Sequence, residues 1–178
     1  MRDFTLKAYT NLLKALKESS CVFHPFSAYL NEPAYRVFIL RHDVDKMPQN
    51  ALDFARLEHE MGISASYYFR IVPQSFNPKI IKEIASLGHE IGYHYEDMDL
   101  CKGDVDKSYA SFQKNLAKLR EIAPIQTVCM HGSPLSKYDN RDLWKKYDYR
   151  ELGIIGEPYF DIDYSKVFYL TDTGRKWN

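Results

Sequence analysis

The sequence predicts an α/β fold built on parallel strands, and three observations support this prediction. Short β-branched and aromatic runs, typical of strands buried on both faces, alternate four times with amphipathic segments of helical period. Strand followed by helix, repeated in this way, requires a parallel sheet or barrel. The 178 residues suit one domain with a single core. Because a complete (β/α)₈ barrel needs about 200–250 residues, we expect an incomplete or distorted barrel or an open sheet.

Four strands are expected, each a short run of β-branched and aromatic residues. In chain order they cover residues 37–40 (VFIL), 66–71 (SYYFRI), 90–95 (EIGYHY) and 125–130 (IQTVCM). Gly92, inside the third run, predicts a close approach of another part of the chain to the backbone. A further short run, 167–170, is a candidate additional strand.

Helices are expected before, between and after these strands, and Gly, Asn or Pro marks several of their ends. In chain order they cover residues 5–18, 50–61, 77–88, 105–119 and 141–151. Gly62 and Gly88 are expected C-caps, and Asn77 is an expected N-cap. No repeat or Gly/Ser linker divides the chain, so we expect one domain over 1–178. It would comprise an N-terminal helical segment, about 1–34, and a βα core, about 35–178.

Composition argues against several classes of function. The 24 Lys and Arg balance 24 Asp and Glu without a basic block, which removes the electrostatic case for nucleic-acid or anionic-membrane partners. The sequence contains no 18-residue apolar run and no secretory signal, and its three cysteines are widely spaced. Free thiols in a reducing compartment fit this pattern, so we expect a cytoplasmic protein. Dinucleotide and P-loop motifs and a nucleophilic-serine elbow do not occur.

Metal-capable side chains follow three of the expected strands, at the carboxyl ends where α/β enzymes carry their chemistry. Asp43 and Asp45 follow the first strand on one face, His94 ends the third, and His131 follows the fourth. Asp45, His94 and His131 offer one oxygen and two nitrogens, which matches a catalytic divalent-metal site with an open position. A helix N-cap or an exposed acidic turn explains the aspartates about equally well, and His94 alone fits a ligand or a structural role.

Three other residues are expected to be structural. His89 lies at the opposite end of its strand from His94 and is expected to cap helix carbonyls. His42 alternates away from Asp43 and should pack behind the first strand. Cys129 lies within the fourth strand and is expected in the core.

Segments LRHDVD, ISASYYFR and LGHEIGYHYED resemble the polysaccharide deacetylases, the chitooligosaccharide-deacetylase-like metal-dependent carbohydrate esterases. The resemblance covers roughly residues 36–135. Downstream stretches MHGSPLSKYDNRDLW, GEPYF and YLTDTGRKW are similar to an HDVD-type subgroup linked to surface-polysaccharide (O-antigen) biosynthesis. The resemblance implies a deacetylase-type barrel lacking C-terminal strand–helix units, and metal-assisted hydrolysis of an acetamide. An open barrel would expose a sheet edge, which a homodimer could cover.

Residue by residue, the resemblance implies Asp43 as the catalytic base and Asp45 and His94 as ligands of one divalent ion, with Zn²⁺ as the default. The paired aspartates are adjacent in the family motif, whereas Val44 separates them here. The roles of Asp43 and Asp45 could therefore be exchanged.

Two family positions are not matched. The second histidine of the family's H-x-x-x-H motif falls at Met98, so we assign the third ligand to His131, with Glu96 or Asp97 as the fallback. The family's proton-donating C-terminal histidine has no counterpart, because no histidine follows His131. Arg41 or a water molecule would then assist the leaving group.

The leading hypothesis is a metal-dependent N-deacetylase acting on an N-acetylated sugar or polysaccharide precursor. A different metal-dependent hydrolase on the same scaffold is a second enzyme hypothesis, since fold and site do not fix the substrate. The contrasting hypothesis is a catalytically impaired relative that acts as a carbohydrate- or partner-binding module.

Overall fold

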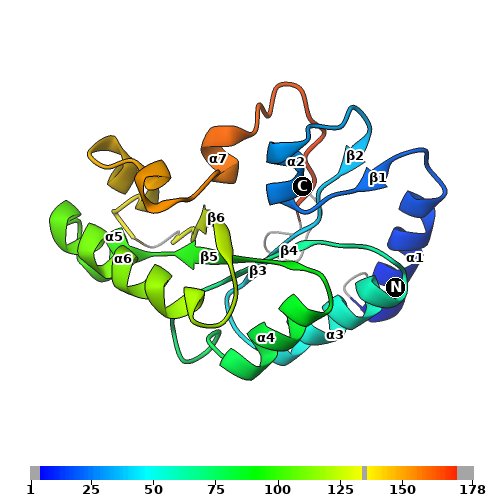
Figure 1. Cartoon of the computed structure of the whole chain (residues 1–178), viewed down its shortest axis with the longest axis horizontal. Helices are drawn as coiled ribbons and strands as arrows, with labels where there is room; N and C mark the ends of the chain where they lie inside the picture. The colour runs from blue at the N-terminus through cyan, green and yellow to red at the C-terminus, as the bar shows by residue number, and fades with distance from the viewer. Residues whose placement is uncertain (1–4, 134–135, 172–178) are drawn as a thin grey trace.

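A four-stranded parallel sheet forms the centre of the structure, a computed structural model that describes residues 5–133 and 136–171 (Figure 1). Its strands are adjacent in chain order: β3 (Arg41–Val44), β4 (Ser66–Phe69), β5 (Glu90–Tyr95) and β6 (Ile125–Met130). Three long helices connect them: α3 (Pro48–Glu60), α4 (Pro78–Ser86) and α6 (Val105–Arg120). This alternation confirms the predicted α/β class with parallel strands.

The three connecting helices lie along one side of the sheet (Figure 1). Right-handed crossovers between neighbouring parallel strands place successive helices on the same face, so this arrangement follows from the strand order. The main apolar core lies between these helices and the sheet. Its large buried side chains include Tyr67, Phe69, Ile81, Ile84, Tyr93, Phe112 and Leu119.

The N-terminal part contains α1 (Leu6–Lys17), β1 (Val22–Phe23), α2 (Phe26–Asn31) and β2 (Val37–Phe38). Strands β1 and β2 form a separate parallel pair. Helix α2 covers the other side of the main sheet at its amino end, where the Phe26 N–H donates to Ser66 Oγ (2.8 Å) and the Ser27 N–H donates to Glu90 Oε2 (3.0 Å). Because α2 makes these contacts at the amino ends of β4 and β5, it leaves the carboxyl ends of the strands on this side available for a functional site.

The chain after β6 is mostly short helical turns: η1 (Asn140–Lys145), η2 (Tyr149–Leu152) and α7 (Pro158–Asp161). The prediction of one helix over 141–151 is therefore wrong. Asp148 accepts a hydrogen bond from the Arg150 N–H and caps η2, so it begins a new turn where a continuous helix would have passed.

The first predicted strand is also displaced. Residues 37–40 split, because Val37 and Phe38 pair with β1 while the following RHDV segment enters the main sheet as β3. Two-residue alternation explains this choice. His42 and Val44 face the connecting helices, and the charged residues that alternate with them, Arg41 and Asp43, face the other side. Residues 167–170 form no strand and are exposed.

Several element ends agree with the sequence. Strands β5 and β6 have the predicted bounds, and Asn77 caps α4 by accepting from two backbone N–H groups. Gly62 and Gly88 adopt positive φ (69° and 88°) after α3 and α4, as expected of C-caps. The four-residue helix α5 (Asp97–Leu100), directly after β5, was not predicted.

Candidate metal centre

Strand alternation gathers the candidate residues on one face of the sheet, opposite the connecting helices. We call this the site face; at its carboxyl end it carries Asp43, His94 and Cys129, which come from three different strands. His94 is paired with Cys129 across β5 and β6. Because parallel strands end at the same edge of a sheet, the residues that follow them, Asp45 and His131, meet there as well.

Three ligand-type atoms converge at this edge. Asp45 Oδ1 lies 3.0 Å from His131 Nδ1 and 3.5 Å from His94 Nε2, and the two imidazole nitrogens are 3.2 Å apart. The structure thus brings together the three residues that the sequence assigned to a metal. Partial burial opposes the charge of the Asp45 carboxylate, but hydrogen bonds from His131 and His94 and the charge of these imidazoles when protonated outweigh it and hold the pKa of Asp45 well below its usual range.

The hydrogen bond behind His94 fixes which of its nitrogens faces the centre with a lone pair. His94 Nδ1 lies 2.9 Å from the Cys129 carbonyl oxygen, which can only accept, so Nδ1 carries the proton. In the neutral imidazole, Nε2 therefore presents its lone pair to Asp45 and His131. Orientation of a metal-binding histidine by a carbonyl acceptor is a common feature of metal sites.

The spacing of the three atoms fits a zinc ion. Zn–N and Zn–O bonds of about 2.0–2.2 Å in a tetrahedral site place neighbouring ligand atoms about 3.3 Å apart. The observed separations of 3.0, 3.2 and 3.5 Å bracket this value. While His94 is neutral, a proton on His131 Nδ1 satisfies only part of the cluster, since His94 Nε2 and Asp45 Oδ1 then face each other as two acceptors. A bound divalent cation would satisfy all three atoms.

Asp43 lies beside this centre and has its own cationic partner. The Asp43 Oδ2 atom is 3.2 Å from Arg41 Nη2, and Asp43 forms a second candidate ligand group with His94 and Cys129. Burial raises the pKa of the Cys129 thiol well above its usual value. Cys129 is fully buried, as its predicted core position implies. The group formed by Asp45, His94 and His131 offers the two nitrogens and one oxygen typical of a three-ligand catalytic site, and we take it as the candidate centre.

The fallback ligands are not at the centre. Glu96 forms a bidentate pair with Arg70, with Nε–Oε1 at 2.9 Å and Nη2–Oε2 at 2.5 Å. Asp97 is buried and accepts hydrogen bonds from Tyr93 (2.7 Å), Ser111 (2.6 Å) and Asn115. Both carboxylates are therefore committed elsewhere.

Residues behind the strands are structural, as expected for His42 and His89. His42 Nε2 lies 2.7 Å from Glu58 Oε1 on α3, and His89 bonds the Ala55 carbonyl through Nε2 (2.9 Å). Glu58 is fully buried and also accepts from the hydroxyls of Tyr9 and Tyr67. This buried cluster ties α1 and α3 to the sheet on the face opposite the metal centre.

Sequence reasoning missed Asn140, which has no motif to reveal it. Its Nδ2 donates to the His131 carbonyl (2.9 Å), and its Oδ1 accepts from the Asp99 N–H (3.3 Å). The His131 N–H in turn donates to the Tyr95 carbonyl (2.8 Å). Buried Asn140 thus holds the segment after β6 against α5 and fixes the backbone of His131.

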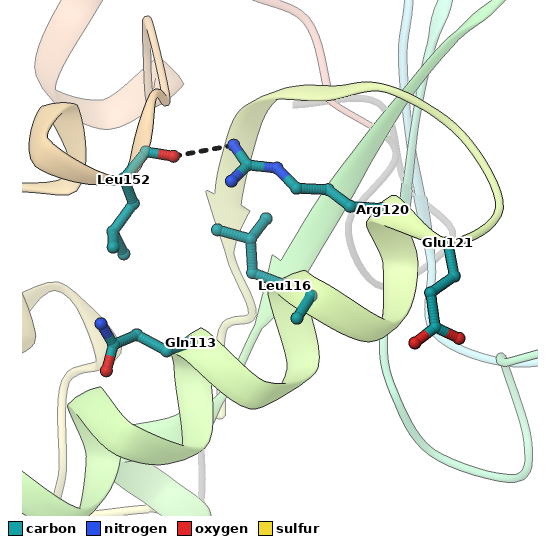
Figure 2. Close-up of a pocket in the computed structure, with 6 residues that line it drawn as sticks. Gln113, Leu116, Arg120, Glu121 and Leu152 are labelled. Carbon is teal, nitrogen blue, oxygen red and sulfur yellow. Dashed lines mark hydrogen bonds between the residues drawn. The ribbon is translucent and has the colours of Figure 1, made fainter.

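Two hollows lie on opposite ends of β6. One, of about 380 Å³, adjoins the metal centre and is lined by Met130–Ser133 and Ser136–Asn140. The other, of about 410 Å³, lies over α6, where Arg120 donates to the Leu152 carbonyl (2.8 Å) (Figure 2). Arg120 also donates to the Ile125 carbonyl (3.1 Å). Ile125 begins β6 and His131 follows its end, so of these two hollows the first is the one beside the candidate ligands.

Comparison with protein-family models, curated proteins and solved structures gives no match for this chain. Residues 134–135 and 172–177, which belong to the stretches similar to the HDVD-type subgroup, lie outside the described part of the structure. None of the helices described has the length and apolar character that a membrane span requires.

Proposed function

We propose that this protein is a divalent-metal-dependent hydrolase that removes the acetyl group from an N-acetylated sugar. The observation that carries the proposal is the convergence of Asp45, His94 and His131 at separations suited to one zinc ion. Consecutive parallel strands with their connecting helices on one side also suit part of a deacetylase-type (β/α) barrel.

The protein's residues have distinct roles in the proposed reaction. A zinc ion held by Asp45, His94 and His131 would polarise the acetamide carbonyl and make an attacking water more acidic. Asp43 accepts the proton of that water, because its carboxylate lies next to the centre without being one of the three converging ligands. Arg41, 3.2 Å from Asp43, orients this base and balances its charge.

Arg41 is suited to electrostatic stabilisation rather than to proton donation. Burial opposes its charge, but the interactions with Cys129, Asp43 and two neighbouring tyrosines outweigh that effect and raise the pKa of the guanidinium above its ordinary value. Among the described residues, His42, His59 and His89 all have partners away from this centre, so the proposal takes the proton for the departing amine from water or from a group recruited with the substrate. The same observation favours the second candidate function, a carbohydrate-binding relative with impaired catalysis.

The test is metal content followed by acetate release. We expect about one zinc per chain after loading with micromolar zinc, and loss of this zinc in Asp45→Ala and His94→Ala. His59→Ala is the matched control, because His59 lies on α3 and bonds the Leu87 carbonyl away from the centre. Acetate release from N-acetylglucosamine oligomers or a UDP-linked N-acetyl sugar should follow the same pattern.

The outcomes separate the two candidates. Zinc binding with acetate release supports the deacetylase, and zinc binding without acetate release supports the binding module. A parent protein that binds no zinc after loading refutes the proposed metal centre, whatever its affinity for sugars.

A further inference from the structure

Asp45 is the least anchored of the three converging residues. Its side chain is 51% exposed, whereas that of His94 is 3% exposed and is held by the Cys129 carbonyl. Asp45 also lies outside β3, in the turn that leads into α3. Met47 in this turn has φ 55° and ψ 59°, a left-handed conformation that is sterically unfavourable for a residue with a side chain. Contacts from elsewhere must therefore hold the turn.

The segment 70–75, which follows β4, supplies these contacts. Buried Ser75 donates through Oγ to the Val44 carbonyl (2.5 Å), and the Gln74 carbonyl accepts from the Met47 N–H (3.1 Å). Between them, Arg70 Nη1 donates to the Asp45 carbonyl (3.4 Å). Val44, Asp45 and Met47 are thus all hydrogen-bonded to the segment 70–75.

Arg70 is itself held in place. Two of its other nitrogens, Nε and Nη2, bond both oxygens of Glu96, whose side chain is 8% exposed. A bidentate pair of this kind fixes the plane of the guanidinium. Glu96 lies two residues after His94, so the pair connects the turn carrying one proposed ligand to the strand carrying another.

We propose that Arg70, held by Glu96, is a positioning residue that sets the place of Asp45 relative to His94 and thereby the affinity of the centre for a divalent metal. This inference rests on the proposed metal centre. It gives the LGHEIGYHYED segment a second role in addition to supplying His94. Glu96 in this segment acts on the centre by holding Arg70, and it is not itself a ligand.

The experiment measures zinc affinity by competition with a chelating dye and the visible absorption of the Co²⁺-loaded protein. We expect Arg70→Ala to bind zinc about 10–100-fold more weakly and to show an altered Co²⁺ spectrum, the usual effect of losing a residue that orients a ligand. Arg70→Lys keeps the charge but cannot bond Glu96 through two nitrogens and Asp45 through a third. It should therefore resemble Arg70→Ala.

The matched control is Arg56→Ala, which removes the arginine of the Arg56–Glu83 pair between α3 and α4, away from Asp45. We expect its zinc affinity within twofold of the parent. Glu96→Gln, which keeps the side-chain shape, replaces Arg70→Ala if that variant does not fold, and weaker zinc binding is again expected.

Each outcome bears on a different claim. If the folded Arg70 variant or Glu96→Gln binds zinc within twofold of the parent and with an unchanged Co²⁺ spectrum, the positioning role is wrong while the metal centre stands. Full affinity in Arg70→Lys would show that charge alone matters and would also overturn positioning. A parent that binds no zinc overturns both the metal centre and this inference.

Discussion

Replacement of Gly92 by alanine should destabilise the protein strongly. A Cβ atom at Gly92 would lie 2.3 Å from both Cδ1 and Cε1 of Tyr68, on the neighbouring strand β4, and 3.0 Å from the Thr127 carbonyl oxygen. The Tyr68 ring is fully buried and cannot move freely. Its hydroxyl is hydrogen-bonded to Thr127 Oγ1 (2.9 Å), which in turn donates to Glu90 Oε1 (2.5 Å).

The size of the effect follows from these contacts. Overpacking of a well-packed core costs about 1–3 kcal/mol. Displacing the Tyr68 ring would also break its buried hydrogen bond to Thr127, at a further cost of about 1–3 kcal/mol. We therefore expect the free energy of unfolding of Gly92→Ala to fall by about 2–6 kcal/mol, measured by urea denaturation of the metal-free protein.

Gly132→Ala provides the control. Gly132 has no heavy atom within 4 Å of a Cβ built on it, so its free energy of unfolding should change by about 0.5 kcal/mol or less. If Gly92→Ala loses less than about 1 kcal/mol, the sheet is able to open around residue 92, and the close packing of β4 against β5 described above is wrong.

Two further predictions concern buried carboxylates. Glu58→Gln removes the charge that pairs with His42 and should lower the free energy of unfolding by about 1.5–3 kcal/mol; Glu83→Gln, in an exposed pair, should cost only about 0–1 kcal/mol. Burial raises the pKa of Glu157 to about 7 from an ordinary 4.5. The folded state therefore holds a proton that the unfolded state loses between these values, and stability falls as pH rises through this window. Between pH 4.5 and 8 the parent should lose roughly 3 kcal/mol more than Glu157→Gln in urea denaturation. Equal costs for the Glu58 and Glu83 variants, or parallel pH profiles, would contradict these predictions.

Much of the fold could be predicted because its signals are local. Short stretches of sequence predict strands β5 and β6, the Asn77 cap of α4, and the ends of α3 and α4 at Gly62 and Gly88. The errors concern segments whose state depends on distant partners. Residues 37–40 look like one strand, but only the presence of β1 beside Val37 explains why the run divides.

The convergence of Asp45, His94 and His131 was predictable because it depends on where parallel strands end. Once His94 ends one parallel strand and His131 follows the next, their meeting at one edge follows from topology. The residues that orient the ligands were not predictable. Arg70 and Asn140 act on backbone carbonyls of residues far away in sequence, and an arginine or asparagine after a strand gives no periodic or motif signal of that role.

The neighbouring aspartates face different environments, which argues for fixed and different roles. Two carboxylates so close would repel and raise the pKa of one of them unless each charge had a partner. Asp43 has Arg41 at 3.2 Å, whereas the Asp45 carboxylate faces the nitrogens of His94 and His131. A carboxylate already balanced by a guanidinium gains less from a metal and remains available to accept a proton. In the proposed centre, the carboxylate that faces two imidazole nitrogens is the better placed of the two to share a cation with them. This difference favours Asp43 as the base and Asp45 as the ligand, and disfavours the exchanged assignment that the intervening Val44 had left open.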